Sequence, residues 1–272
     1  MIGRDNANRV YGAYAKLPAP IRRAGFALIP RSWRARVRHW AKGEAKIIDA
    51  EIRALDGTPW HDFRSGFSTA GTTERVVEYP WILSRYSGER RVLDAGTANA
   101  FPPYLRGLRS LGIPELHGVD LMQARIEGIV MTQADIRQMP FDEGFFDQIF
   151  CVSTLEHIGQ DTTSQGIDRR EEVQGSVQAL REMRRVLRDG GHVLVTVPFG
   201  KPRDYGWFKQ YDLASWQKTV ELAGLSQVEV AFYGYSPQGW SPFADGHDLE
   251  AADYRAMGAQ AATAVLCSVL RR

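Results

Sequence analysis

The chain has 272 residues, of which 44% are hydrophobic and 24% are charged, and its formal net charge is +2 at pH 7. This length suffices for one large domain with a well-filled core, or for one domain with an extension. Charges that nearly cancel give no general attraction to nucleic acid or to a membrane surface. We therefore do not expect a nucleic-acid partner.

The two cysteines, Cys151 and Cys267, lie in apolar runs without zinc-type spacing. Buried free thiols fit this pattern, and they are typical of a reducing compartment. The sequence has no apolar run near the roughly 18 residues of a membrane span, and its first residues lack a secretory signal pattern. We expect a cytoplasmic protein without integral membrane contact.

The first 70 residues differ in pattern from the rest of the chain. Ser32 is a suitable helix N-cap, and apolar residues then recur at helical spacing as far as Leu55. A basic amphipathic helix of this kind can lie on anionic lipid, but acidic residues enter its second half, which favours a helix packed against protein. We expect residues 1–70 to form a helical cap or lid on a main domain of residues 71–272.

From about residue 72 the pattern alternates between helix and strand. Helices are expected at residues 72–86, 102–112, 171–191 and 213–224. Strands are expected at residues 91–96, 116–121, 128–135, 146–153, 192–200, 225–233 and 262–270. Strands separated by helix-length segments pair in parallel through right-handed crossovers. This predicts an α/β fold with a doubly wound sheet, whose ligands bind at the carboxyl ends of the strands.

The ends of the first two expected strands carry the first candidate site residues. Asp94 and Gly96 end the first strand, and the glycine lets the backbone approach a ligand closely. Asp120 ends the second strand, at a spacing where an acidic residue can accept hydrogen bonds from ribose hydroxyls. Each signal is weak by itself, because aspartates often end strands.

The order of the sequence blocks makes these signals specific. The blocks are "VLDAG", "GVDL", "QADIRQMPFDEGFFDQIFCVSTLEHIG" and "REMRRVLRDGGHVLVTVPFG". As a set over residues 88–200 they resemble the class I S-adenosylmethionine-dependent methyltransferases, and within them the small-molecule, type 11-like subgroup. The resemblance implies a Rossmann-like sheet of parallel strands with a final antiparallel strand and helices on both faces.

The same resemblance implies S-adenosyl-L-methionine as cofactor and S-adenosyl-L-homocysteine as product. Asp94 and Gly96 would hold the methionine part, and Asp120 the ribose hydroxyls. Asp135, with the backbone of Ile136, would bind the adenine amino group. The implied cofactor site is completed by Ala95, Thr97, Leu121 and Ser153. These roles agree with the chemistry, since carboxylates favour a sulfonium cation nearby and accept hydrogen bonds from an amino group.

The turn departs from the family pattern at Ala98 and Ala100, where relatives carry glycine. Alanine costs about 1–2 kcal/mol if its backbone must be left-handed, and almost nothing if the backbone is right-handed. This cofactor has no pyrophosphate that would require close packing against several amides. We therefore expect a working cofactor turn with ordinary backbone at both alanines.

The expected catalytic residues follow the fourth strand in the segment "STLEHIG". His157 titrates near neutral pH and is the candidate general base for a hydroxyl acceptor. Glu156 is a candidate second base, or a group that orients the acceptor. Relatives with different acceptors share these residues, so a structural or cofactor-supporting role of His157 stays open.

Acceptor specificity is expected from two inserts, residues 199–212 and 232–254, which are rich in aromatic and acidic residues. Aromatic rings cover the apolar faces of sugars while carboxylates bind their hydroxyls. Sugar O-methylation is the interpretation we favour, with some actinobacterial sugar O-methyltransferases as an analogy. The candidate substrate-binding residues are Tyr205, Trp207, Tyr211, Trp240 and His247. The inserts could instead form only a packed lid. The alternative reaction is C- or O-methylation of a quinone, phenolic or lipid-linked compound.

Three further hypotheses concern metal, rival functions and assembly. Asp245, His247, Asp248 and Glu250 could include ligands of Mg²⁺, which prefers oxygen. Acidic loops are usually only solvated, so no metal site is expected. A Rossmann oxidoreductase is disfavoured because the first turn lacks a complete G-x-G-x-x-G. The alternative function that is not enzymatic is a protein that binds the cofactor without catalysis. In its assembly, the protein could be a homodimer.

Overall fold

The computed structural model describes residues 43–159, 169–206 and 208–272. A helix over residues 43–53 comes first. The longer helices that follow are α4 (Arg75–Leu83), α5 (Pro102–Ser110), α6 (Arg169–Val186) and α7 (Leu213–Ala223). The strands of the main sheet are β1 (Arg91–Ala95), β2 (Glu115–Asp120), β3 (Val130–Gln133), β4 (Phe146–Val152), β5 (Leu187–Pro198), β8 (Ser226–Ser236), β9 (Gly239–Phe243) and β10 (Ala264–Arg271).

The eight strands of this sheet follow the order β3-β2-β1-β4-β5-β10-β8-β9. Strands β1 to β5 pair in parallel, whereas β10 is antiparallel to both β5 and β8. The doubly wound α/β sheet with a final antiparallel strand is therefore confirmed. The strand order reverses at β1, which lies between β2 and β4. A ligand of such a sheet binds at this switch point, beyond the carboxyl ends of the strands.

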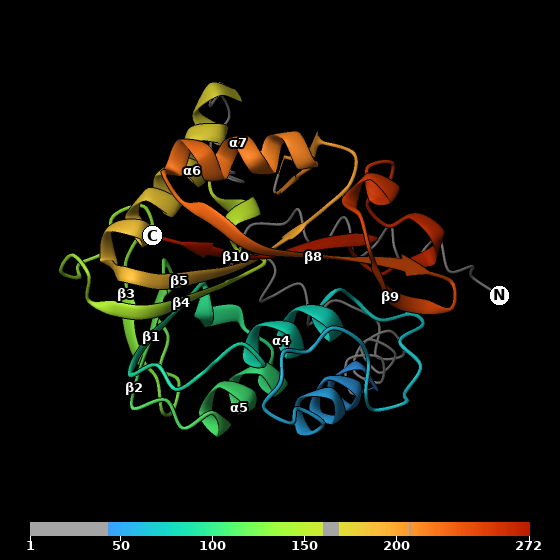
Figure 1. Cartoon of the computed structure of the whole chain (residues 1–272), viewed down its shortest axis with the longest axis horizontal. Helices are drawn as coiled ribbons and strands as arrows, with labels where there is room; N and C mark the ends of the chain where they lie inside the picture. Colours follow the sequence, from blue (N-terminus) through green and yellow to red (C-terminus); the bar gives the residue numbers. More distant parts are fainter. Residues whose placement is uncertain (1–42, 160–168, 207) are drawn as a thin grey trace, which may run out of the picture.

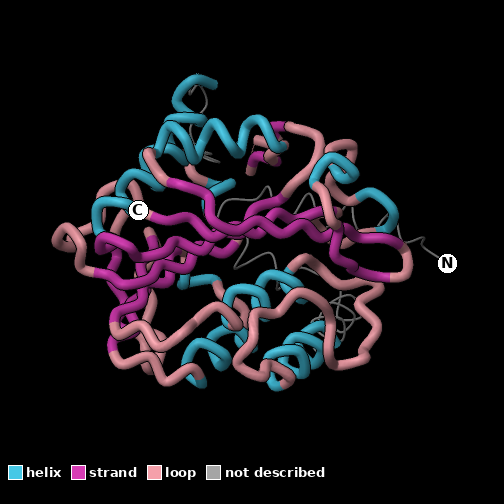
Figure 2. Tube along the Cα trace, viewed as in Figure 1, coloured by secondary structure: helices cyan, strands magenta, loops and turns pink. Residues whose placement is uncertain are grey.

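Helices cover both faces of the sheet (Figure 1). Helices α6 and α7 lie on one face, whereas α4, α5 and the helix of residues 43–53 lie on the other, so that the coloured tube shows three layers (Figure 2). Each interface between helices and sheet has its own apolar cluster of buried side chains. Burial on both faces explains why β1, β4 and β5 are nearly continuous apolar runs in the sequence.

The ends of α7 show how the local sequence sets an element. The Asp212 side chain accepts a hydrogen bond from the Ser215 amide, 2.8 Å away, and the Ser215 hydroxyl accepts one from the Asp212 amide. This reciprocal cap satisfies amides that the first helical turn leaves unpaired. Gly224 ends the helix with a φ of 71°, a left-handed conformation that glycine adopts without strain.

Two parts of the structure differ from the sequence prediction. Gly190 and Gly191 were expected to end the helix of α6, but that helix already ends at Val186 and both glycines lie inside β5. They belong to a bulge there, because the register between β4 and β5 shifts after the pair Phe146 and Leu187. The strand β9 and the short hairpin of β6 (Arg203–Asp204) and β7 (Lys209–Gln210) lie in the segments expected to be inserts.

The described part of the N-terminal segment packs on the main domain. Ile48 and Trp60 are fully buried in the apolar cluster on the α4 side of the sheet. The predicted helix start at Ser32 lies outside the described residues. Among the residues that the structure describes, there is no helix long and apolar enough to cross a membrane.

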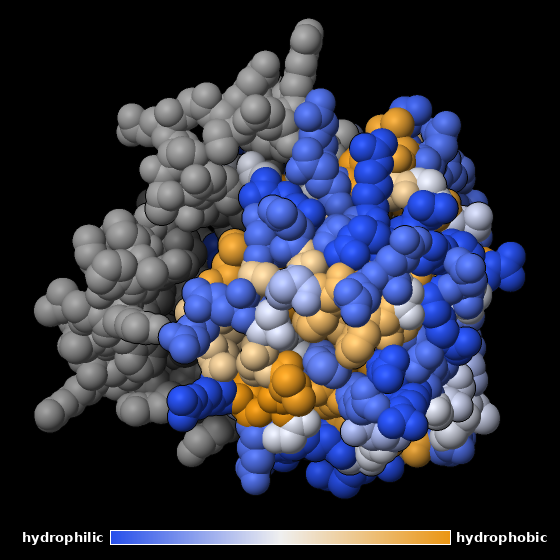
Figure 3. Space-filling view, turned by 90° about the vertical axis from the view of Figure 1, so that its left-hand side faces the viewer, coloured by the Kyte–Doolittle hydropathy of each residue, from blue (hydrophilic) through white to orange (hydrophobic). Residues whose placement is uncertain are grey.

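The molecule also has an apolar patch near the β3 edge of the sheet. Figure 3 views this side and shows hydrophobic residues surrounded by hydrophilic ones. Leu121, Met122 and Val130, from the end of β2 and from β3, are exposed apolar side chains. Leu121 is 64% exposed, and it directly follows Asp120 at the switch point.

Candidate active site

The turn after β1 is built around Gly96, whose φ of 89° is left-handed. A Cβ on this residue would lie 2.2 Å from Oγ1 of Thr154, so glycine is required both for its conformation and for the space. Residues Thr97–Asn99 form a short 3-10 helix, and Ala100 is extended with a φ of −62°. Among the described residues only Ser153, Arg255 and Met257 combine a side chain with positive φ. The expectation of ordinary backbone at Ala98 and Ala100 is confirmed.

Asp120 joins this turn to the end of β2. Its Oδ2 accepts a hydrogen bond from the Ala98 amide and its Oδ1 accepts one from the Met122 amide, both at 2.9 Å. A carboxylate has about four lone-pair sites, so each oxygen keeps capacity for a further donor. The turn that begins at Gly96 and the end of β2 at Asp120 are thus joined at one edge of the sheet.

Asp94 lies on β1, two residues before Gly96, and its side chain is buried. Its Oδ1 accepts a hydrogen bond of 2.7 Å from the Tyr104 hydroxyl, and the Thr97 hydroxyl donates to its backbone carbonyl at 2.6 Å. Burial raises the pKa of Asp94 to about 7, although the hydrogen bonds from Tyr104 and Thr97 act in the opposite direction. Tyr104 is a partner that the sequence pattern did not single out.

Asp135 lies after β3 and is paired with Arg137. The Arg137 amide donates to its Oδ1 at 2.9 Å, and the guanidinium donates to Oδ2 at 2.6 Å. The hydrogen bond from Arg137 lowers the pKa of Asp135. Ile136 beside it is buried in the core, so only its backbone is available to a ligand.

Ser153 ends β4 with a strained φ of 39°. Its hydroxyl donates to Oε1 of Glu78 at 2.6 Å, and the Thr196 hydroxyl donates to the same oxygen at 2.8 Å. Glu78 comes from α4, and its other oxygen pairs with Arg75. This buried contact ties α4 to the carboxyl ends of β4 and β5.

Glu156 and His157 follow in a 3-10 helix of residues Leu155–His157. The Glu156 side chain is only 2% exposed, whereas that of His157 is 40% exposed, and 3.8 Å separate Oε1 of Glu156 from Nε2 of His157. Burial is the main cause that raises the pKa of Glu156 to about 8. The His157 ring also lies 6.3 Å from the ring of Phe208, centroid to centroid.

The aromatic substrate candidates do not converge on one place. Tyr205 stacks on Phe208 at 4.6 Å between ring centroids, and this pair adjoins His157. Tyr211 and Trp240 are buried in the two core clusters on opposite sides of the sheet. His247 is exposed, and Trp207 lies outside the described residues. Substrate binding by these five residues stays a prediction.

The segment of residues 245–250 contains a 3-10 helix, Gly246–Leu249, and its polar side chains make local contacts. The Asp245 carboxylate accepts a hydrogen bond of 3.0 Å from the His247 amide, and the His247 ring lies 3.6 Å from the Glu250 carboxylate. The part of the chain that the structure describes has no group of three or more side chains placed to hold a metal ion.

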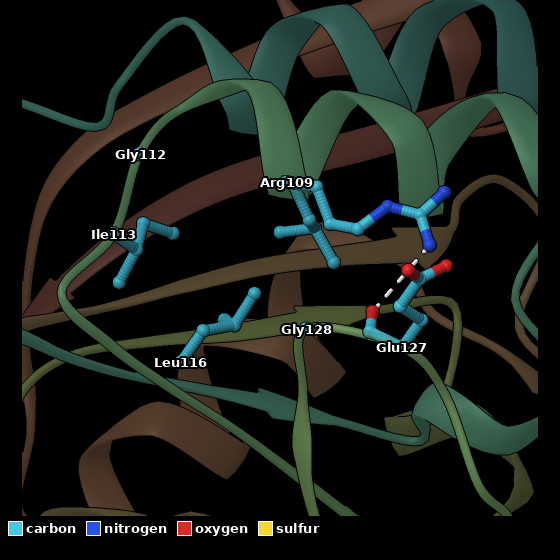
Figure 4. A pocket seen from close by; sticks show the side chains of 7 residues that line it. Arg109, Gly112, Ile113, Leu116, Glu127 and Gly128 are labelled. Carbon is cyan, nitrogen blue, oxygen red and sulfur yellow. Dashed lines mark hydrogen bonds between the residues drawn. The ribbon is translucent and has the colours of Figure 1, made fainter.

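A pocket of about 380 Å³ lies away from the switch point, at the end of α5 and the start of β2 (Figure 4). Its lining includes Leu108, Ile113 and Leu116, and the Arg109 guanidinium reaches the Glu127 carbonyl at 3.4 Å. It contains none of the candidate site residues. We therefore assign the site to the carboxyl ends of β1, β2 and β4, which Gly96, Asp120 and Glu156 follow or end.

The segment that carries Gly96, Asp120 and His157 is similar to a known protein family. Residues 93–195 match the methyltransferase domain family. The matched segment of the methyltransferase domain includes β1, β2, β3 and β4 and most of β5, and with them the Gly96 turn, Asp120 and His157.

Two curated proteins and one solved structure are similar to the chain. The first is a protein of Encephalitozoon cuniculi that is named as a methyltransferase. It is 33% identical to the chain over 133 residues, which are 47% of this chain and 51% of that protein. The ubiquinone/menaquinone biosynthesis C-methyltransferase UbiE of Hahella chejuensis is 32% identical over 109 residues, 40% of this chain and 37% of that protein. The chain thus spans about half or less of the length of these relatives. The cyclase SpnF has a similar fold, with a TM-score of 0.50 and 15% identity over 83% of this chain and 92% of that one.

Proposed function

We propose that the chain is an S-adenosylmethionine-dependent methyltransferase whose cofactor binds at the switch point between β1 and β4. The observation that carries the proposal is the hydrogen bond from Ala98 to Asp120, which joins the Gly96 turn to a carboxylate with spare lone pairs. The match of residues 93–195 to the methyltransferase domain family supports it.

The residues around the turn fit the parts of this cofactor. When bound, it supplies an electrophilic methyl group on a sulfonium centre. Asp120 would accept the ribose hydroxyls through its free lone pairs, and the exposed Leu121 offers an apolar surface for the adenine ring. Asp94 and Gly96 would contact the methionine part. Asp135 would take the adenine amino group while it keeps its ion pair with Arg137.

We assign the proton transfer to His157. A hydroxyl acceptor must lose its proton as the new bond forms, and a neutral imidazole is a suitable base near neutral pH. Glu156, whose Oε1 lies 3.8 Å from Nε2, would favour the resulting imidazolium when its own carboxyl group is ionised. The half-buried ring of Tyr205, which stacks on the buried Phe208 near His157, suits the apolar face of a sugar, which is the acceptor that we propose.

The test of the proposed function uses two separate measurements on the full chain. Calorimetry with S-adenosylhomocysteine measures cofactor binding, and transfer of a labelled methyl group to a panel of sugars measures turnover. Binding with turnover on a sugar supports the proposal. Binding without turnover on any acceptor would favour a cofactor-binding protein that is not an enzyme, and no binding would remove both functions.

A second candidate function is C-methylation of a quinone precursor. It is favoured by the similarity to the C-methyltransferase of Hahella chejuensis, which covers 40% of this chain. A demethylated quinone added to the same acceptor panel separates the two candidates. Carbon methylation leaves a product that resists the cleavage that removes methyl ethers, so the product also identifies the bond formed.

A further inference from the structure

Four buried glutamates meet at the carboxyl ends of β4 and β5, beside α4. They come from three separate segments of the chain, and each is at most 7% exposed. We call them the acidic cluster: Glu44, Glu74, Glu78 and Glu156. Among the residues that the structure describes, the cation within this cluster is Arg75, on which the charges of Glu78, Glu74 and Glu156 act.

Two members of the acidic cluster are well satisfied. Glu44 accepts hydrogen bonds from the amide and the hydroxyl of Thr73. Glu78 accepts the hydroxyls of Ser153 and Thr196 and pairs with Arg75. Both carboxylates therefore have partners within the protein, which is sufficient for a structural role.

Glu74 and Glu156 are not satisfied in the same way. Oε2 of Glu74 accepts a long hydrogen bond of 3.3 Å from the Ala262 amide, its one hydrogen bond within the described part of the chain. Oε2 of Glu156 is buried and, among the described residues, has no hydrogen-bond partner. The charges of Glu78 and Glu74 act on Glu156, and that of Arg75 opposes them. An unpartnered carboxylate oxygen at this depth is costly unless a donor or a cation joins it.

We propose that the acidic cluster binds an ammonium group of the acceptor, with Glu156 and Glu74 as its partners. The inference rests on the proposed methyl transfer and names the class of acceptor, an amine-bearing molecule such as an amino sugar. An ammonium group carries three N–H donors. It would supply both the missing partner of Glu156 and the positive charge that one guanidinium cannot provide for four carboxylates.

The position of the cluster favours the acceptor over the sulfonium as the source of this cation. The cofactor residues Gly96 and Asp120 lie at the ends of β1 and β2. The acidic cluster lies beside β4 and β5 instead, where Glu78 accepts the hydroxyls of Ser153 and Thr196. The Thr154 side chain stands against Gly96. Oε1 of Glu156 lies 3.8 Å from Nε2 of His157, the proposed base, so an ammonium group at the cluster would hold a neighbouring hydroxyl near that base.

Binding of a cation should also release protons. Burial raises the pKa of Glu156 to about 8 and that of Glu74 to about 7, and it also raises the pKa of Glu44. A bound ammonium stabilises the ionised carboxylates and lowers these pKa values again. At pH 7 the cluster would therefore lose protons when the ligand binds, which a neutral ligand would not cause.

The experiment measures ammonium binding by calorimetry on the full chain saturated with S-adenosylhomocysteine. The probes are ethanolamine, glucosamine and tyramine, each compared with its neutral counterpart, which is ethylene glycol, glucose or 4-ethylphenol. At least one ammonium probe should bind about tenfold or more tighter than its counterpart, as charged hydrogen bonds would give. Titrations in two buffers of different ionisation enthalpy should show proton release at pH 7.

The variants Glu74→Gln and Glu156→Gln should remove this preference and the proton release, whereas the surface variant Glu221→Gln should keep both. A lack of preference for any ammonium probe would overturn the inference. So would unchanged selectivity in both cluster variants. Binding of S-adenosylhomocysteine tests the proposed function independently, because its failure would show in the first titration.

A final comparison separates the two sources of cation. S-adenosylmethionine carries a sulfonium that S-adenosylhomocysteine lacks. If the cluster serves the acceptor, the ratio of the two affinities should be the same in the wild type and in Glu74→Gln. A ratio that falls by about tenfold in this variant would assign the cluster to the sulfonium and contradict the proposal.

Discussion

Asp120 accepts the amide hydrogen of Ala98 at 2.9 Å, and this bond joins the end of β2 to the turn after β1. Asp120→Asn should weaken binding of S-adenosylhomocysteine by at least about tenfold, because an amide nitrogen replaces one of the two accepting oxygens. Calorimetry measures the change. Asp142→Asn, an exposed substitution elsewhere, should bind like the wild type. Equal binding by both variants would contradict the role of Asp120.

Gly96 and Ala98 should respond to substitution in opposite ways. Gly96→Ala should lower the free energy of unfolding by more than the about 1–2 kcal/mol of a left-handed alanine, because its Cβ also meets Thr154. Ala98→Gly should cost only the flexibility of glycine, about 0.5–1 kcal/mol. Urea unfolding measures both values. The double variant with Thr154→Ala should recover only the steric part, and full recovery would show that the φ of Gly96 carries no strain.

The turn after β1 shows which parts of the candidate site could be predicted from the sequence alone. The positions of Gly96, Asp94 and Asp120 at the ends of β1 and β2 could be predicted because local residues and their order decide where these strands end. Glu78 was missed because its role depends on a contact with Ser153, 75 positions away in the sequence. No local pattern distinguishes a helical glutamate that meets a strand end from one that faces solvent. The sequence likewise predicted aromatic residues for the acceptor, but the packing of Tyr211 and Trp240 depends on the whole sheet.

Asp94 should make the stability of the cofactor-free chain depend on pH. Its pKa in the folded state is about 7, above the ordinary value of 3.8 because of burial. The folded state therefore binds a proton that the unfolded state has lost, and the stabilisation present below pH 3.8 is lost as the pH rises to about 7. This loss is at most about 1.4 kcal/mol for each pH unit.

The measurement is urea unfolding of the wild type and of Asp94→Asn at pH 5 and pH 8. Asparagine keeps an oxygen for the Tyr104 hydroxyl but has no proton to lose. The variant should therefore show a smaller decrease of stability between the two pH values than the wild type. Identical decreases would mean that other groups, such as Glu74 and Glu156, cause the dependence.

Removal of divalent metal should leave methyl transfer unchanged. The His247 and Asp248 side chains are exposed and that of Glu250 is partly exposed, and His247 contacts Glu250 in the same turn. Solvated carboxylates of this kind bind Mg²⁺ weakly compared with a preformed oxygen cage. Turnover with and without a chelator measures the effect. A loss that added Mg²⁺ restores, and that His247→Ala reproduces, would assign a metal site to this loop.

His157→Asn should separate chemistry from binding. The imidazole is the proposed base for a hydroxyl acceptor, so turnover should fall by about 10²–10⁴-fold, while the affinity for S-adenosylhomocysteine should change little because His157 lies on the acceptor side of Glu156. Tyr205→Leu, which removes the half-buried ring that stacks on Phe208 and keeps the imidazole, should raise KM more than it lowers kcat. Single-turnover rates across pH 5 to 9 complete the test. If His157→Asn keeps both the rate and the pH profile of the wild type, the proton leaves by another route and the histidine has only a supporting role.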